Sequence, residues 1–196
     1  MLNIVFILAL GFAILLLGGW VYMFQMPGQS YKGSPVSPSP ELVQDVKNHV
    51  FKLSGEIGER NLNYYNELQS AADYIQKELE KYGYHVSLQE YNIQEKKCAN
   101  LIAEKMGTSK KDEIIVIGAH YDSVEGSPGA NDNASGVAST LALAKFFASQ
   151  ENKRTLRFVA FVNEEPPYFK TEQMGSWHYV QNILEKKEKV QTKLLE

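Results

Sequence analysis

The chain has 196 residues, a formal net charge of −3 and a single cysteine, Cys98. This length suits one globular domain with a short appendage. The small negative charge argues against a nucleic-acid partner. A lone cysteine excludes an internal disulfide and argues against a zinc site built from thiolates.

The amino-terminal stretch is apolar. Residues 1–31 carry no charged side chain, and Ile4–Phe24 is almost wholly apolar. As a helix this run would rise about 32 Å, which is enough to cross a bilayer. A cleaved signal peptide would instead need a basic start and a shorter apolar core. We therefore predict a transmembrane signal anchor over residues 1–25, with Trp20 and Tyr22 at the membrane interface.

Residues 26–40 hold four of the seven prolines, together with several serines and glycines. Such a composition predicts an extended, semi-rigid linker. Residues 41–196 then form the predicted globular domain.

The first part of this domain shows alternating helix and strand patterns. Helical periodicity covers Glu41–Leu53 and Asn66–Tyr82, and Gly83 is placed to stop the second helix. Strand patterns cover Val86–Ile93 and Asn100–Lys105, and a polar turn is expected at Thr108–Asp112.

The centre of the domain reads as strand, helix, strand. Ile114–Ile117 and Phe158–Val162 are short apolar runs typical of strands buried on both faces, and residues 133–147 have helical spacing between them. A right-handed crossover would make the two strands parallel. The expected fold class is therefore α/β, with three α/β/α layers around a mixed, largely parallel central sheet.

Past the second strand, Pro166-Pro167 forces a loop, and a further helix is expected at Met174–Lys187. Its apolar spacing predicts that Trp177, Val180 and Leu184 point inward. Val190–Leu195 reads as the next strand.

Polar clusters stand where the two central strands end. His120 and Asp122 follow the first strand, Asp132 lies in the loop before the helix, and Glu164 and Glu165 follow the second strand. Open parallel sheets gather their ligands at this edge, and histidine with carboxylates is a typical zinc ligand set.

Each cluster also has a plainer interpretation when it is taken alone. A histidine after a strand is more often structural, Asp-Asn-Ala-Ser-Gly is a common helix cap, and adjacent glutamates usually face solvent. A calcium loop starting at Asn131 fails, because its twelfth position is Ala142 rather than a bidentate glutamate. The coincidence of all three clusters at one sheet edge favours a site.

The motifs His120-Tyr-Asp122-Ser, Gly129-Ala-Asn-Asp132-Asn-Ala-Ser-Gly and Asn163-Glu164-Glu165 resemble the zinc-dependent exopeptidases of clan MH. They look most like its aminopeptidase and glutamate carboxypeptidase family. The upstream stretches Gly58–Asn61 and Ala99–Ala103 are also similar to that family. The resemblance implies a phosphorylase/hydrolase-like fold and two zinc ions.

The resemblance also implies a role for each motif residue. His120 would bind one zinc, Glu165 would bind the second, and Asp132 would bridge both, with a cis peptide bond after it. Asp122 would orient His120. Glu164 would be the general base that takes the proton of the attacking water.

The family has two further ligands. One is an acidic residue at the end of the next strand, where Glu196 stands, and the other is a distal histidine that this chain lacks. His178 does not match that histidine and is expected to be structural or exposed. The domain is therefore expected to be incomplete at its C-terminus, and the second zinc site lacks its distal histidine.

The resemblance predicts a zinc aminopeptidase that acts on peptides outside the cytoplasm, and the apolar amino-terminal run predicts that it is membrane-anchored. One alternative is a glutaminyl cyclase, a single-zinc relative that also carries His-Tyr-Asp-Ser and a glutamate pair, although the Asn-Asp-Asn-Ala-Ser-Gly loop favours the peptidase. Another alternative is an inactive remnant or binding domain. The oligomeric state stays open.

Overall fold

The computed structural model describes residues 2–24 and 37–194, and the chain falls into two units, residues 1–37 and 38–196. The first unit contains one helix, α1 (Leu2–Phe24). Among the described residues, no helix has both the length and the apolarity that crossing a membrane requires, so the predicted transmembrane helix is not supported. Most of the predicted linker, residues 26–36, lies outside the described residues.

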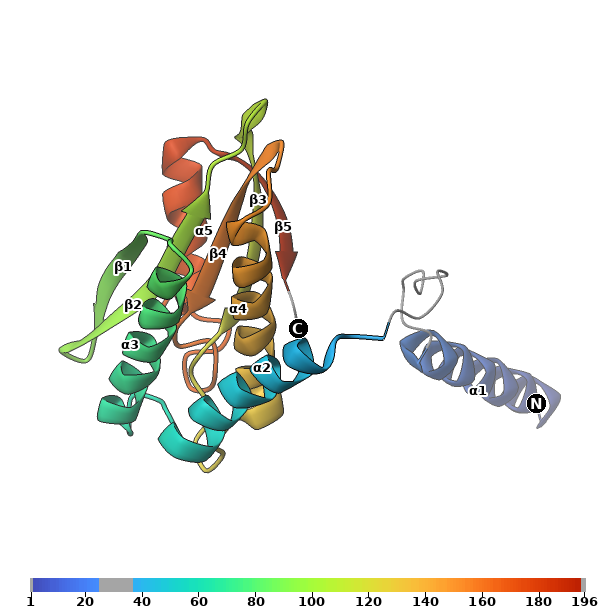
Figure 1. Ribbon diagram of the computed structural model, residues 1–196. Helices are drawn as coiled ribbons and strands as arrows, with labels where there is room; N and C mark the ends of the chain where they lie inside the picture. The colour runs from blue at the N-terminus through green and yellow to red at the C-terminus, as the bar shows by residue number, and fades with distance from the viewer. Residues whose placement is uncertain (1, 25–36, 195–196) are drawn as a thin grey trace. The chain divides into compact units, whose positions relative to one another are not determined.

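The second unit is built on a five-stranded sheet with the order β1-β2-β4-β3-β5 (Figure 1). The strands are β1 (Val86–Ile93), β2 (Lys96–Lys105), β3 (Lys110–His120), β4 (Arg154–Phe161) and β5 (Lys189–Leu194). The pairings of β3 with β4 and of β3 with β5 are parallel, whereas β2 pairs antiparallel with both β1 and β4. The predicted mixed sheet is confirmed, but "largely parallel" is wrong for these strands, because half of the pairings are antiparallel.

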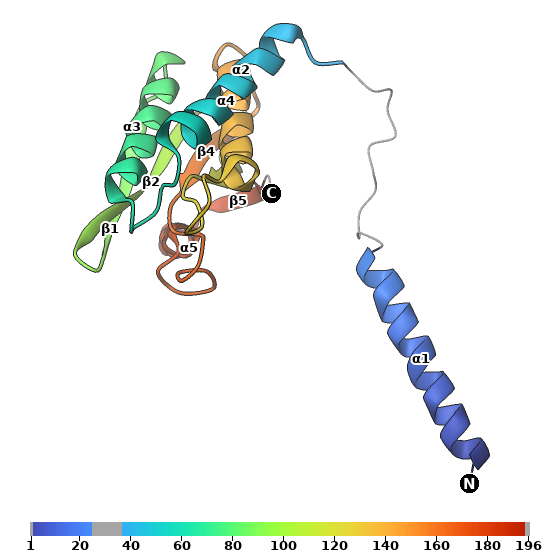
Figure 2. The same ribbon diagram turned by 90° about the horizontal axis from the view of Figure 1, so that it is seen from below.

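Helices cover both faces of the sheet. Figure 2 shows α2 (Pro40–Val50), α3 (Tyr65–Lys81) and α4 (Ser135–Ala148) on one side and α5 (Gly175–Lys186) on the other. The side chains of β4 alternate between these layers. Phe158 and Ala160 join the larger core under α3 and α4, while Val159 and Phe161 pack with Tyr179 of α5. The predicted three-layer α/β/α arrangement is thus present.

Local signals explain several of the element boundaries. Ser39 caps α2, because its Oγ accepts a hydrogen bond from the Leu42 N–H at 3.2 Å, and Pro40 occupies the first turn. The helix continues as a π-helical segment, Phe51–Ile57. Gly83 has a φ of +90°, which explains why α3 ends before it.

Two local predictions are wrong. The turn expected at Thr108–Asp112 is shorter, because β3 already begins at Lys110, which pairs with Arg154 across an irregularity in the ladder. The other wrong prediction concerns α5, where the side chains that face the core are not the predicted set.

Val180 and Leu184 are 48% and 64% exposed, whereas Tyr179 is buried and Ile183 packs beside it. Tyr179 and Ile183 form a second apolar stripe on the same helix, with a spacing of four residues. The aromatic ring of Tyr179 packs against Phe161 and Val159 of β4.

Candidate metal centre

The candidate site lies where β3 and β4 end side by side. The two strands run parallel, and His120, the last residue of β3, pairs with Phe161, the last residue of β4. Asp132 lies in a kinked turn, Ala130–Ala134, whose backbone is non-helical at Asp132 and Asn133 and which leads directly into α4. Glu165 lies four positions after Phe161, the last residue of β4. The strand–helix–strand connection therefore brings three segments that are distant in sequence to one sheet edge.

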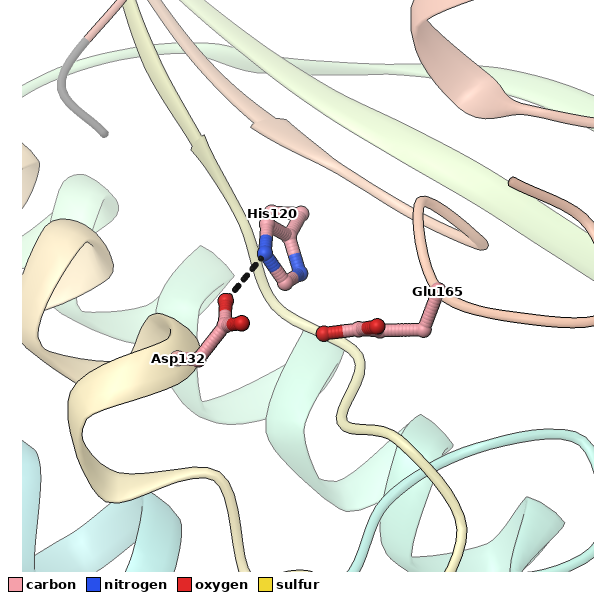
Figure 3. Close-up of side chains that lie close together, drawn as sticks. All are labelled: His120, Asp132 and Glu165. Atoms are coloured by element: carbon pink, nitrogen blue, oxygen red, sulfur yellow. Dashed lines mark hydrogen bonds and ion pairs between the residues drawn. The ribbon is translucent and has the colours of Figure 1, made fainter. Parts of the chain in front are cut away.

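Figure 3 shows the side chains of His120, Asp132 and Glu165 directed toward one another. One ligand atom from each of these residues lies within 4.8 Å of the ligand atoms of the other two. Among residues 2–24 and 37–194, this is the one group of three or more side chains with such spacing. One imidazole nitrogen and two carboxylates form a donor set that suits zinc, and also other divalent transition metals.

The two nitrogens of His120 have different surroundings. Nδ1 lies 3.2 Å from the backbone oxygen of Asp122 and 3.5 Å from its Oδ1. Nε2 lies 2.9 Å from Oδ1 of Asp132, whose side chain is 72% exposed. Protein oxygens therefore hold the Nδ1 side of the ring, and Nε2 is the nitrogen that would face a cation bound among the carboxylates.

Charges at the site are crowded. Burial lowers the pKa of His120, but the hydrogen bond and charge of Asp122, with the charges of Asp132 and Glu165, outweigh burial and raise this pKa to about 9. Burial and the nearby charge of Asp132 raise the pKa of Glu165. Two carboxylates held this close repel each other, and a bound cation would relieve that repulsion. The residues present therefore fit a divalent metal ion.

Asp122 is buried and connects the ends of both strands. Its Oδ1 accepts a hydrogen bond from the Glu164 N–H at 3.2 Å, and its Oδ2 accepts one from the Glu165 N–H at 3.1 Å. It also lies against His120. One carboxylate thus fixes the ring of His120 and the backbone that carries the glutamate pair.

Glu164 is half-buried and lies outside the three-residue ligand group. Both of its carboxylate oxygens accept hydrogen bonds from Ser176. Burial raises the pKa of Glu164, although the hydrogen bonds from Ser176 oppose this shift. The side chain lines a cavity of about 780 Å³ that also contains His120, Asp132 and Glu165. Glu164 therefore lines the same cavity as the three candidate ligands without belonging to their group.

The peptide bond between Asp132 and Asn133 is cis, as the family resemblance implied. Asn133 is buried, and its Oδ1 accepts a hydrogen bond from the Gly136 N–H at 2.8 Å in the first turn of α4. This bond connects the loop that carries Asp132 to the helix after it.

His178 was expected to be structural or exposed, and Glu196 was predicted as a further ligand. His178 stacks on Tyr91, with 3.9 Å between the ring centroids, and is not part of the ligand group. Glu196 lies outside the described residues, so its part as a ligand stays a prediction.

Sequence reasoning gave no role to Arg60, which the structure places under the site with no exposed surface. Its guanidinium donates hydrogen bonds to five backbone carbonyls, those of Leu53, Gly58, Tyr121, Pro128 and Gly129. Tyr121 lies between His120 and Asp122, and Gly129 precedes the turn that holds Asp132. Arg60 therefore connects the segments that supply two ligands. Its place in the motif Gly58-Glu-Arg60-Asn61 was the available signal.

Ser176 was also missed, since a serine near a helix start reads as an ordinary capping residue. Its position one residue after Gly175, at the beginning of the helix that follows the glutamate pair, was the only signal in the sequence.

Comparisons with known proteins agree with this geometry. The model of peptidase family M28 matches residues 100–195. The uncharacterized protein YfbL of Escherichia coli is 32% identical over 150 residues, which are 72% of this chain and 46% of that protein. Aminopeptidase YwaD of Bacillus subtilis is 43% identical over 77 residues, which are 39% of this chain and 16% of that protein. The chain thus spans less than half the length of these curated relatives.

Solved structures share the fold. BSAP, a zinc aminopeptidase from Bacillus subtilis, matches with a TM-score of 0.69 at 18% identity, over 82% of this chain and 70% of that chain. The glutaminyl cyclase of Fimbriiglobus ruber matches with a TM-score of 0.66 at 21% identity, over 86% of this chain and 65% of that chain. With the family match and the ligand geometry together, the resemblance to clan MH is confirmed, and the chain belongs to peptidase family M28.

Proposed function

We propose that this chain acts as a zinc-dependent exopeptidase of the aminopeptidase type. The observation that carries the proposal is the convergence of His120, Asp132 and Glu165, beside a carboxylate, Glu164, that is not part of the ligand group. Family membership supports the reaction class. The named aminopeptidases among the relatives support the substrate class, a peptide with a free amino terminus.

His120 through Nε2, Asp132 and Glu165 would hold the metal. When bound, a zinc ion lowers the pKa of a coordinated water and polarises the carbonyl that the water attacks. Asp122 keeps His120 and Glu165 in place for that purpose through the contacts of 3.5 and 3.1 Å. The family implies a second zinc; by the resemblance Glu165 would bind it, Asp132 would bridge both ions, and Glu196 stays a further predicted ligand.

Glu164 is assigned as the general base. Hydrolysis needs a carboxylate that stays free to accept a proton from water and to pass it to the leaving amine. Glu164 lines the cavity, lies next to a ligand in sequence and is held by Ser176 rather than by the ligand group. Its raised pKa, caused mainly by burial, makes it a better proton acceptor than an exposed glutamate.

The test replaces Glu164 with Gln in the full chain and measures zinc content together with hydrolysis of peptides that have free or acetylated amino termini. We expect turnover of the free peptides to fall by about 10²- to 10⁴-fold while zinc is retained. The exposed Glu151→Gln variant is the matched control and should keep wild-type turnover. Undiminished turnover in Glu164→Gln would rule out Glu164 as the base.

The same assay separates the other candidate functions. Conversion of an amino-terminal Gln to pyroglutamate on the intact peptide, with loss of ammonia, would favour the glutaminyl cyclase, whose fold this chain shares. Zinc binding without turnover of any peptide would favour a binding domain. Faster cleavage of acetylated than of free peptides would contradict the aminopeptidase type while leaving a peptidase.

A further inference from the structure

The start of α5 is joined to the end of β4 by a seam of four residues: Asn100, Val162, Gly175 and Ser176. The Gly175 N–H donates to the Val162 carbonyl at 2.8 Å. Asn100 is fully buried, and its Nδ2 donates to the Gly175 carbonyl at 2.7 Å while its Oδ1 accepts from the Val162 N–H at 3.2 Å. The first residue of α5 is therefore fixed against the strand that leads to Glu164.

Only glycine fits at the first residue of α5. A Cβ added at Gly175 would lie 2.1 Å from Oδ1 of Asn100 and 2.6 Å from the Val162 carbonyl oxygen. Asn100 cannot turn away without breaking its three side-chain hydrogen bonds, which join it to Gln89, Gly175 and Val162, and the Val162 carbonyl belongs to the backbone. The close approach of α5 to β4 at this point is therefore built into the sequence.

Ser176 uses this fixed position to hold Glu164. Its backbone N–H donates to Oε1 of Glu164 at 2.6 Å, and its Oγ donates to Oε2 at 2.8 Å. The same residue thus occupies both oxygens of one carboxylate. Both are charge-assisted bonds, and the amino-terminal end of α5 adds a favourable dipole.

This hold matters because of what lies next to Glu164. A glutamate has three rotatable side-chain bonds, and the adjacent Glu165 belongs to the ligand group. A released Glu164 carboxylate could turn toward the metal ligands and become a ligand itself, after which it could not accept a proton. Fixing both oxygens prevents that rotation and keeps the carboxylate at the cavity wall.

We propose that Ser176 is the positioning residue of the general base, and that the other three residues of the seam, Asn100, Val162 and Gly175, hold Ser176 in place for this task. The inference rests on the proposed function, in which Glu164 accepts the proton. Ser176 also lines the cavity, but its backbone N–H and its Oγ both donate to Glu164, so we assign its effect on the reaction to Glu164.

Three variants of the zinc-loaded full chain test the proposal: Ser176→Ala, Ser176→Thr and Ser139→Ala. Ser139 is the matched control, because it is a half-buried helical serine whose Oγ donates to the Ser135 carbonyl at 2.9 Å. Loss of one hydrogen bond to a charged group should lower the kcat of Ser176→Ala by about tenfold or more, with KM unchanged. Ser176→Thr keeps the hydroxyl and should recover most of kcat, and Ser139→Ala should match the wild type.

A second readout does not depend on activity. In crystal structures of the same variants, we expect the Glu164 carboxylate to leave its position in Ser176→Ala and to keep it in Ser176→Thr and Ser139→Ala. An unmoved Glu164 with an unchanged kcat in Ser176→Ala would overturn the proposal. The proposal would also be overturned if Ser176→Thr had a kcat as low as that of Ser176→Ala while Glu164 kept its position in both variants.

The two readouts separate this inference from the proposed function. If the wild type hydrolyses no peptide but Glu164 moves only in Ser176→Ala, the peptidase function fails and the positioning by Ser176 stands. If the wild type is active and Glu164→Gln is inactive, but Ser176→Ala is unaffected in rate and structure, the function stands and the positioning role is wrong.

Discussion

The buried carboxylate of Asp122 accepts a hydrogen bond from the backbone N–H of Glu165 at 3.1 Å. Asp122 comes two residues after His120, and it lies 3.5 Å from Nδ1 of that ring. A candidate ligand at the end of β3 and a candidate ligand after β4 are therefore held by one side chain. The spacing of the candidate ligands thus involves a residue that is not itself part of their group.

Replacing Asp122 with Asn should weaken metal binding. An amide offers one acceptor oxygen, and its NH₂ group would face an N–H donor, so the hydrogen bonds to Glu164 and Glu165 cannot both persist. We expect zinc affinity, measured by calorimetric titration, to fall by about 10- to 100-fold. The exposed Asp112→Asn is the control and should bind zinc as the wild type does. Equal affinity in both variants would show that Asp122 does not organise the ligands.

Arg60 links stability to the site. Burial lowers the pKa of its guanidinium to about 10, and its hydrogen bonds all run to backbone carbonyls. Arg60→Lys cannot reach these carbonyls from one ammonium nitrogen, and each carbonyl left without a partner costs free energy. We expect the free energy of unfolding in urea to fall by about 2–4 kcal/mol, with weaker zinc binding.

Arg154→Lys is the control for this change. Arg154 is half-buried, and its Nε donates to Glu113 at 2.6 Å. A pair of this kind is worth about 1 kcal/mol or less, so the loss should be much smaller than for Arg60. Equal losses in the two variants would contradict the special role of Arg60.

The three ligand positions could be predicted from sequence because the strand–helix–strand pattern is local. Short apolar runs marked β3 and β4, and the topology of a parallel crossover then determined which loops meet. His120, Asp132 and Glu165 follow from that geometry together with the family motifs. The segment that carries each candidate ligand could therefore be predicted before its neighbours in space.

Other features depend on contacts that no sequence period encodes. The burial of Arg60 reflects backbone carbonyls supplied by segments about 60 to 70 residues away along the chain. The inward face of α5 was mispredicted because Trp177, Val180 and Leu184 satisfy helical spacing as well as Tyr179 and Ile183 do, and only packing against β4 separates the two stripes. The antiparallel pairing of β4 with β2 likewise depends on tertiary contacts rather than on a local sequence pattern.

Gly136 should not tolerate a side chain. A Cβ at this position would lie 2.1 Å from Oδ1 of Asn133, the atom that accepts the hydrogen bond of the Gly136 N–H. Gly136→Ala should expel this buried amide and remove the cap of α4, with a loss of about 1–2 kcal/mol in unfolding free energy. Displacement of Asn133 should also shift Asp132 and weaken zinc binding. Gly18→Ala in α1, where nothing lies within 4 Å, should change neither quantity.

An unchanged zinc affinity in a destabilised Gly136→Ala would mean that the position of Asp132 does not depend on Asn133. An unchanged stability would mean that Asn133 can relocate without cost. Thermal unfolding and zinc titration of the same sample distinguish these results.

The stability of the fold should depend on pH through a buried histidine, His49, that lies outside the candidate metal centre. His49 of α2 is 3% exposed, and its Nδ1 is 2.6 Å from the Tyr74 hydroxyl. Burial lowers the pKa of His49 below its usual 6.5, although the charges of Asp45 and Glu78 oppose the shift. The folded state therefore resists protonation of His49, while the unfolded state accepts the proton at about 6.5.

The sign of the effect follows. Above pH 6.5 His49 is neutral in both states and its contribution to stability is complete. As the pH falls below 6.5, the unfolded state binds a proton first, so stability is lost until the lowered folded pKa is passed. In His49→Gln this loss should be absent. The difference in unfolding free energy between the wild type and His49→Gln should therefore shift by up to about 1.4 kcal/mol per pH unit below 6.5, in the direction that disfavours the wild type. The charged neighbours Asp45, Glu78, Lys81 and Lys145 are present in both proteins, so the difference isolates His49.

Urea unfolding at a series of pH values from 7.5 down to about 5 measures this difference in unfolding free energy. The exposed His85→Gln, which retains His49, is the matched control. A wild type and a His49→Gln variant whose stabilities run parallel over this range would show that His49 is protonated equally in both states.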